Sequence, residues 1–137
     1  MEILDLPKEV VISKDNVDVF FYPEKKLLYF IWKQRTTGEA YRQIYISALE
    51  YFEVHRPTHF LSDIRNQGII GPNDRKWFQE EVIARALELG LKKSAAILDG
   101  NSFKLYYMNI IMSFSKNKGL PVKLFNIPEE AIQWLFD

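Results

Sequence analysis

The residues best suited to chemistry follow a predicted buried strand over residues 58–64. Asp63, Arg65 and Asn66 lie where that strand ends, at the edge of an α/β sheet where ligands usually bind. Asp63 and Arg65 are two residues apart, so both side chains can point the same way. Arg65 is therefore a candidate anion clamp beside the N-terminus of the next helix. The alternative is an ion pair that only fixes the loop.

The two histidines do not form a recognisable metal or catalytic pattern. His55 and His59 are four residues apart, but Pro57 lies between them and breaks the helical spacing that metal ligation on one helix would need. No carboxylate cluster accompanies them, the chain has no cysteine, and its six glycines form no phosphate-binding motif. The sequence predicts no catalytic residue, no metal site and no cofactor.

Composition narrows the classes of partner and the location. The chain has 137 residues, which fits one domain over 1–137, with residues 1–8 as an N-terminal extension. Its 18 basic and 18 acidic residues balance, so no electrostatic footprint for nucleic acid is present. No apolar run approaches the roughly 20 residues that span a bilayer. The first residues do not resemble a signal peptide, and we expect a cytoplasmic protein.

Hydrophobic patterning predicts an α/β fold. Three strand patterns come first, and helices then alternate with strands to the end of the chain. The first helix is expected to begin with a capping box formed by Thr36 and Glu39. Two others are expected to end at Gly90 and Gly119. The predicted fold is a single-layer mixed sheet of five to six strands, an antiparallel hairpin followed by βαβαβα, with four helices.

Two of the predicted helices carry more apolar surface than one sheet can cover. On the helix after Pro72, one stripe of apolar residues should face the sheet, and further apolar residues lie outside that stripe. The helix over 101–118 is apolar on nearly all of its faces. The candidate interface residues are Trp77, Ile83, Ala84, Leu87, Tyr107, Met108, Ile111 and Met112. Neighbouring helices can bury such flanks, a homodimer or other protein partner can cover them, and a pocket for an apolar small molecule can use them.

Several segments resemble one known family. The stretches 61–68, 72–77, 85–93, 123–125 and 130–135 are similar to the bacterial SpoIIAA-like branch of the STAS superfamily. That branch shares its fold with the anti-sigma-factor antagonists and, more distantly, with CRAL-TRIO lipid-transfer domains. In the antagonists, a serine at the start of the helix after a buried strand is a phosphorylation switch. The corresponding stretch here, 68–74, has no Ser or Thr, so the resemblance does not carry that switch over.

Three functions follow from these observations, in order. The first is a non-enzymatic regulatory or protein-interaction module that self-associates through helical aromatic surface. The second is a binder or carrier of a small apolar, lipid-like ligand. The third is an enzyme that uses Asp63 and Arg65 with His59, which requires the three side chains to share a cleft.

Overall fold

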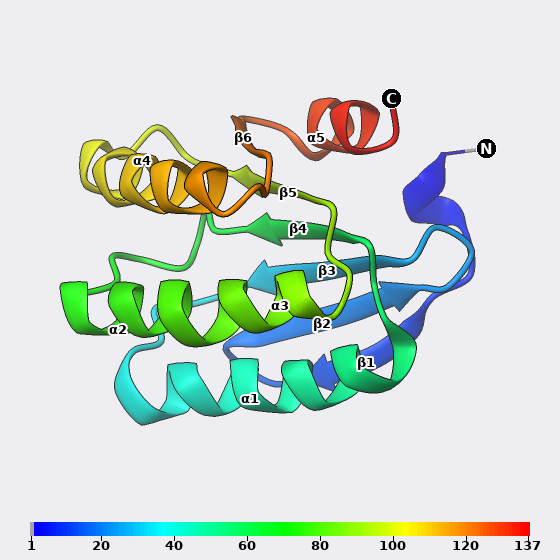
Figure 1. Cartoon of the computed structure of the whole chain (residues 1–137), viewed down its shortest axis with the longest axis horizontal. Helices are drawn as coiled ribbons and strands as arrows, with labels where there is room; N and C mark the ends of the chain where they lie inside the picture. Colours follow the sequence, from blue (N-terminus) through cyan, green and yellow to red (C-terminus); the bar gives the residue numbers. More distant parts are fainter. Residues whose placement is uncertain (1) are drawn as a thin grey trace.

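The sheet of this protein has its strands in sequence order. The computed structural model describes residues 2–137, and its six strands run in the order β1-β2-β3-β4-β5-β6 (Figure 1). The strands are β1 (Glu9–Ser13), β2 (Val17–Tyr22), β3 (Leu27–Trp32), β4 (His59–Asp63), β5 (Lys93–Ile97) and β6 (Val122–Phe125).

The sheet is mixed, as predicted. Strands β1, β2 and β3 pair antiparallel, whereas β3, β4, β5 and β6 pair parallel. Strand β3 joins the two halves and is apolar along its whole length, with five of its six residues buried. A strand covered on both faces has this continuous apolar character rather than an alternating one.

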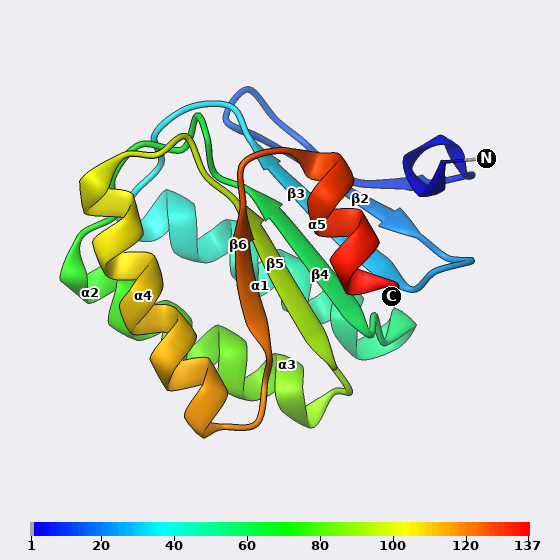
Figure 2. The same ribbon diagram turned by 90° about the horizontal axis from the view of Figure 1, so that it is seen from above.

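Helices cover the two faces of the sheet unequally (Figures 1 and 2). The helical segments are η1 (Ile3–Asp5), α1 (Gly38–His55), α2 (Pro72–Trp77), η2 (Phe78–Ile83), α3 (Ala84–Glu88), α4 (Ser102–Asn117) and α5 (Pro128–Leu135). The larger core lies between the sheet and α1, η2, α3 and α4. The smaller core lies on the opposite face, under α5 and the N-terminal residues. Within residues 2–137, no helix has the length and apolarity to cross a membrane.

The start of α1 differs from the predicted capping box. Thr36 bonds instead to Asn16 and to the Gln34 carbonyl, and no side chain of the N-cap residue caps the helix. The amide of Gly38 donates to Oδ2 of Asp74 at 2.8 Å. A carboxylate from α2 therefore caps α1, which local sequence could not reveal because the partner is 36 residues away.

The helix after Pro72 is continuous but not regular. Its middle turn, η2, is a π-helix, in which an extra residue per turn shifts the register of every residue after it. Ile83, which lay off the predicted core stripe, is consequently buried together with Val82. The predicted ends at Gly90 and Gly119 are confirmed, since both glycines have positive φ just after their helices.

Candidate functional site

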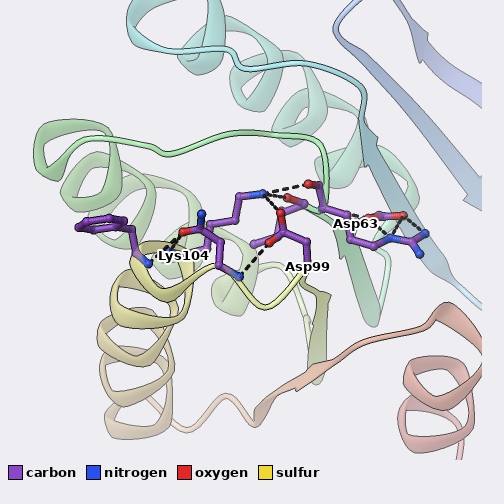
Figure 3. Close-up of polar contacts among 7 residues, drawn as sticks. Asp63, Asp99 and Lys104 are labelled. Atoms are coloured by element: carbon purple, nitrogen blue, oxygen red, sulfur yellow. Dashed lines mark hydrogen bonds and ion pairs between the residues drawn. The ribbon is translucent and has the colours of Figure 1, made fainter.

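The carboxyl end of β4 holds an ion pair between Asp63 and Arg65. Asp63 is buried, and its Oδ1 accepts from Arg65 N at 3.1 Å and Nε at 3.0 Å. Its Oδ2 accepts from Nη2 at 2.7 Å (Figure 3). These hydrogen bonds raise the pKa of the Arg65 guanidinium above its ordinary value. Asp63 takes the Nε and Nη2 side of the guanidinium in a bidentate pair, and this pairing within one loop favours a loop brace over an anion clamp.

The remaining candidate residues of this edge do not converge on it. Asn66 is exposed on the loop after Arg65. His59 lies at the opposite end of β4 from Asp63, about 13 Å away at the usual rise of a strand. His59 stacks on Phe136 at 4.4 Å between ring centres, and burial lowers its pKa. The three side chains proposed for an enzyme therefore do not share a cleft.

The other histidine is also occupied by structural contacts. His55, at the end of α1, stacks on Tyr51 with ring centres 3.8 Å apart. Among residues 2–137, no group of three or more histidine, cysteine, aspartate or glutamate side chains is arranged to hold a metal ion.

A buried lysine links α4 to the ends of β4 and β5. Lys104 is only 3% exposed, and its Nζ donates to the carbonyls of Ile64 at 2.8 Å and Arg65 at 3.0 Å. The third contact is Oδ2 of Asp99 at 3.2 Å (Figure 3). An ammonium group has three donors, so every one is used, and the cost of burying the charge is offset.

The start of α4 is capped by the same segment. Oδ1 of Asn101 accepts from the amides of Phe103 at 2.9 Å and Lys104 at 3.1 Å, which is the arrangement of a helix N-cap. Asp99 accepts from the amide of Asn101 at 3.2 Å. Burial opposes ionisation of Asp99, but the Asn101 amide and the Lys104 ammonium together outweigh it and hold the pKa of Asp99 below the ordinary value. The first turn of α4 is thus fixed in orientation.

That fixed turn presents aromatic side chains to solvent. Phe103 is 68% exposed and Tyr106 is 70% exposed, and a spacing of three residues puts them on one face of α4. The residues exposed between 102 and 115 are Ser102, Phe103, Leu105, Tyr106, Asn109 and Ser113. None is charged. We call this surface the outer face of α4.

Four of the predicted interface residues are buried within the chain itself. Tyr107, Met108 and Ile111, predicted at an interface, are buried in the larger core, as is Ile83. Their apolar character is explained by packing against the sheet and the neighbouring helices. Lys104 is buried on the same side of α4 as these residues, whereas a lysine in an apolar helix is ordinarily placed on the outside.

The other four predicted interface residues are half-buried. Trp77, Ala84, Leu87 and Met112 each keep part of their surface in contact with solvent. Trp77 packs edge-on against Tyr41, with ring centres 6.3 Å apart, and the guanidinium of Arg42 lies 5.4 Å from its ring. An interface at these four residues stays a prediction.

The larger core contains a cavity of about 70 Å³ between the sheet and helices α1, η2, α3 and α4. Its lining is mostly apolar but includes Tyr107 and Ser115. The hydroxyls of both are buried without a hydrogen-bond partner in the described chain. Buried hydroxyls are normally bonded, so these two mark the cavity as a place where a polar atom would be stabilised.

Comparison with known proteins bears on the fold. No protein-family model and no curated protein sequence matches this chain. A crystal structure of an uncharacterised protein of the DUF3478 family from Shewanella loihica PV-4, described as having a SpoIIAA-like fold, is similar to it with a TM-score of 0.55. The two sequences are 18% identical, and the match covers 94% of this chain and 92% of the other. The α/β arrangement described above is therefore a SpoIIAA-like fold.

Proposed function

We propose that this chain is a non-enzymatic protein-interaction module that self-associates through the outer face of α4. The observation that carries the proposal is the exposed, uncharged surface around Phe103 and Tyr106. A surface helix normally turns charged and polar residues to water. Enrichment in aromatic side chains together with depletion of charge is typical of the centre of a protein interface.

A second copy of the chain fits this face. A two-fold interface must match itself, because the same surface patch is used on both subunits. An uncharged face can do so without opposing like charges. The chain carries no net charge, so two copies do not repel each other at long range.

The contacts of Lys104 support the proposal from within the fold. They fix the first turn of α4 to the ends of β4 and β5, so the aromatic side chains are presented on a rigid support. Pre-organisation of this kind lowers the entropic cost of association. The separation of His59 from the Asp63–Arg65 pair supports an interaction function over a catalytic one.

Light scattering coupled to size exclusion tests the proposal. The parent chain is expected to elute as a dimer, and Tyr106→Glu as a monomer, because the substitution buries an unpaired charge in the interface. Val54→Glu is the matched control, since Val54 is 77% exposed on α1 and lies outside the proposed contact. A monomeric parent at high concentration, or a dimer unaffected by Tyr106→Glu, contradicts the proposal.

The cavity supports a second candidate function, the binding of a small molecule. The unpaired hydroxyls of Tyr107 and Ser115 are the observation that favours it. Ligand sites usually enclose about 300–1,000 Å³, so a space of about 70 Å³ suits only a molecule of a few heavy atoms. A lipid-like occupant requires the helices to move apart.

Native mass spectrometry of the purified chain tests this candidate. A retained molecule adds a discrete mass under native conditions that disappears on denaturation. Equal masses under the two conditions argue against a resident ligand.

A further inference from the structure

Strand β6 is an open edge of the sheet. It pairs with β5 on one side, and within residues 2–137 no strand pairs with its other side. The Pro121 carbonyl accepts from the amide of Ser94 in β5 at 3.1 Å, and the Phe125 carbonyl accepts from the amide of Leu98, just after β5, at 2.9 Å. Alternate residues of a strand direct their backbone groups to opposite sides, so the N–H and C=O groups of Val122 and Leu124 face away from the sheet. They are free to pair with an added strand.

A groove runs along this edge, which lies between α4 and α5 in the ribbon of Figure 2. It has a volume of about 740 Å³ and is bounded by the C-terminal half of α4 on one face of the sheet and by α5 on the other. Met112 and Leu120 supply apolar surface on the α4 side, and Trp134 supplies it on the α5 side. A strand laid against β6 would place alternate side chains against these two walls.

The charges of the groove have one sign. Lys116 and Lys123 line it, and no acidic residue does. A third lysine, Lys93, donates to the Trp134 carbonyl at 3.0 Å and lies over its ring. The acids of α5 and of the residues after it, Glu129, Glu130 and Asp137, are not part of the lining. A partner segment with acidic side chains would therefore be complementary to the groove.

The opposite edge of the sheet is protected where β6 is not. Strand β1 is interrupted by an irregularity between Val10 and Ile12, and Glu9 accepts a hydrogen bond from the Tyr51 hydroxyl. Bulges and occupied side chains discourage added strands. Strand β6 keeps a regular register with β5. Lys123 on β6 discourages the addition of a neutral or basic strand, as a lysine on an edge strand generally does. The same lysine attracts an added strand that carries acidic side chains.

We propose that the β6 edge binds an extended, acidic segment of a partner protein by strand addition. The segment pairs with the backbone of Val122 and Leu124, places apolar side chains against Met112 and Trp134, and directs its carboxylates to Lys116 and Lys123. A second copy of this chain is a poor occupant, because pairing β6 with β6 brings the lysines of both copies together. The proposal extends the interaction function. Asn109 and Ser113 belong both to the groove and to the outer face of α4, but Phe103 and Tyr106 do not line the groove, so Tyr106→Glu distinguishes the two surfaces.

Selection from a displayed library of random decapeptides against the full chain provides the probe. The enriched peptides are expected to be acidic, and the tightest one is then synthesised with a fluorophore for anisotropy titration. Lys116→Glu/Lys123→Glu should weaken its binding by at least about tenfold, because both substitutions reverse the complementary charge. Lys14→Glu/Lys76→Glu makes the same change in net charge at exposed sites elsewhere and should weaken it by less than about twofold.

N-methylation of the synthetic peptide tests the pairing itself. Only every second amide of an added strand faces β6. Methyl groups on the amides that face β6 should therefore abolish binding, and methyl groups on the other amides should leave the affinity unchanged. Tyr106→Glu should bind the peptide as the parent does, which separates this surface from self-association. Enrichment of neutral or basic peptides, equal effects of the two methylated sets, or no enrichment would overturn the proposal.

Discussion

Lys104→Met is the substitution that probes how α4 is held. Methionine preserves most of the length of the buried side chain and removes the ammonium group that bonds to Ile64, Arg65 and Asp99. Hydrogen bonds to charged groups contribute about 1.5–3 kcal/mol each, and contributions within one network do not add fully. The carbonyl of Ile64 keeps its bond from the Gln67 amide, which reduces the loss.

The expected loss in the free energy of unfolding is about 3 kcal/mol, within a range of roughly 2–4. The carbonyl left unsatisfied adds to this loss, whereas recovery of the desolvation cost of the buried charge reduces it. Asp99→Asn is the matched control. It keeps Oδ1 as the acceptor for the Asn101 amide. It replaces Oδ2, the acceptor for Lys104, by an NH2 group and removes the charge from a side chain that is 40% exposed. It should cost about 0.5–1 kcal/mol.

Urea unfolding followed by circular dichroism measures both losses, with an unchanged slope as the sign that only stability has altered. Two protein concentrations should be compared, because self-association adds to the apparent stability. A loss below about 1 kcal/mol for Lys104→Met, or a larger loss for Asp99→Asn, would refute the view that the lysine fixes α4.

Three further predictions concern the rest of the fold. Asp74→Ala should lower the free energy of unfolding by about 1–2 kcal/mol, because the Gly38 amide loses its cap; an unchanged urea midpoint would contradict the long-range cap. Burial lowers the folded-state pKa of His59. The neutral side chain therefore contributes to stability above the ordinary histidine pKa of about 6.5, and this contribution is lost as the pH falls through the folded-state pKa. As the pH is lowered from about 8 to about 5, the urea midpoint of His59→Gln should accordingly fall less than that of the parent. Equal falls in the two proteins would contradict a contribution of His59 to the pH dependence of stability. Ser115→Ala and Tyr107→Phe should change stability by no more than about 0.5 kcal/mol if their hydroxyls are unpaired, whereas a loss above about 1 kcal/mol measured by urea unfolding would indicate a bound partner in the cavity.

The strand pattern was predictable from sequence because its signals are local. The apolar run of β3 and the turn residues around it specify a central strand, and Gly90 and Gly119 end their helices by a backbone geometry that glycine adopts readily. These elements predicted the mixed α/β sheet, and the resemblance of several segments to a known family implied the SpoIIAA-like fold; both were confirmed.

The features that depend on distant contacts were not predictable. The cap on Gly38 comes from Asp74, and a pattern search within the helix finds Thr36 instead. The π-helical turn changes which residues of 78–83 face the core, while periodicity analysis assumes a constant helical repeat. The rotation of α4 depends on the burial of Lys104, which requires two carbonyls from the loop after β4.

Cross-linking measures most directly whether the outer face of α4 joins two copies of the chain. The protein has no cysteine, so Ser102→Cys and Asn109→Cys each place a single thiol beside the aromatic pair, on exposed positions of that face. We expect a short bismaleimide to convert both variants to covalent dimers at low micromolar protein. The Val54→Cys variant, with its thiol on α1, should stay monomeric. Equal cross-linking of the three variants, or none in the α4 variants, would contradict self-association through this face.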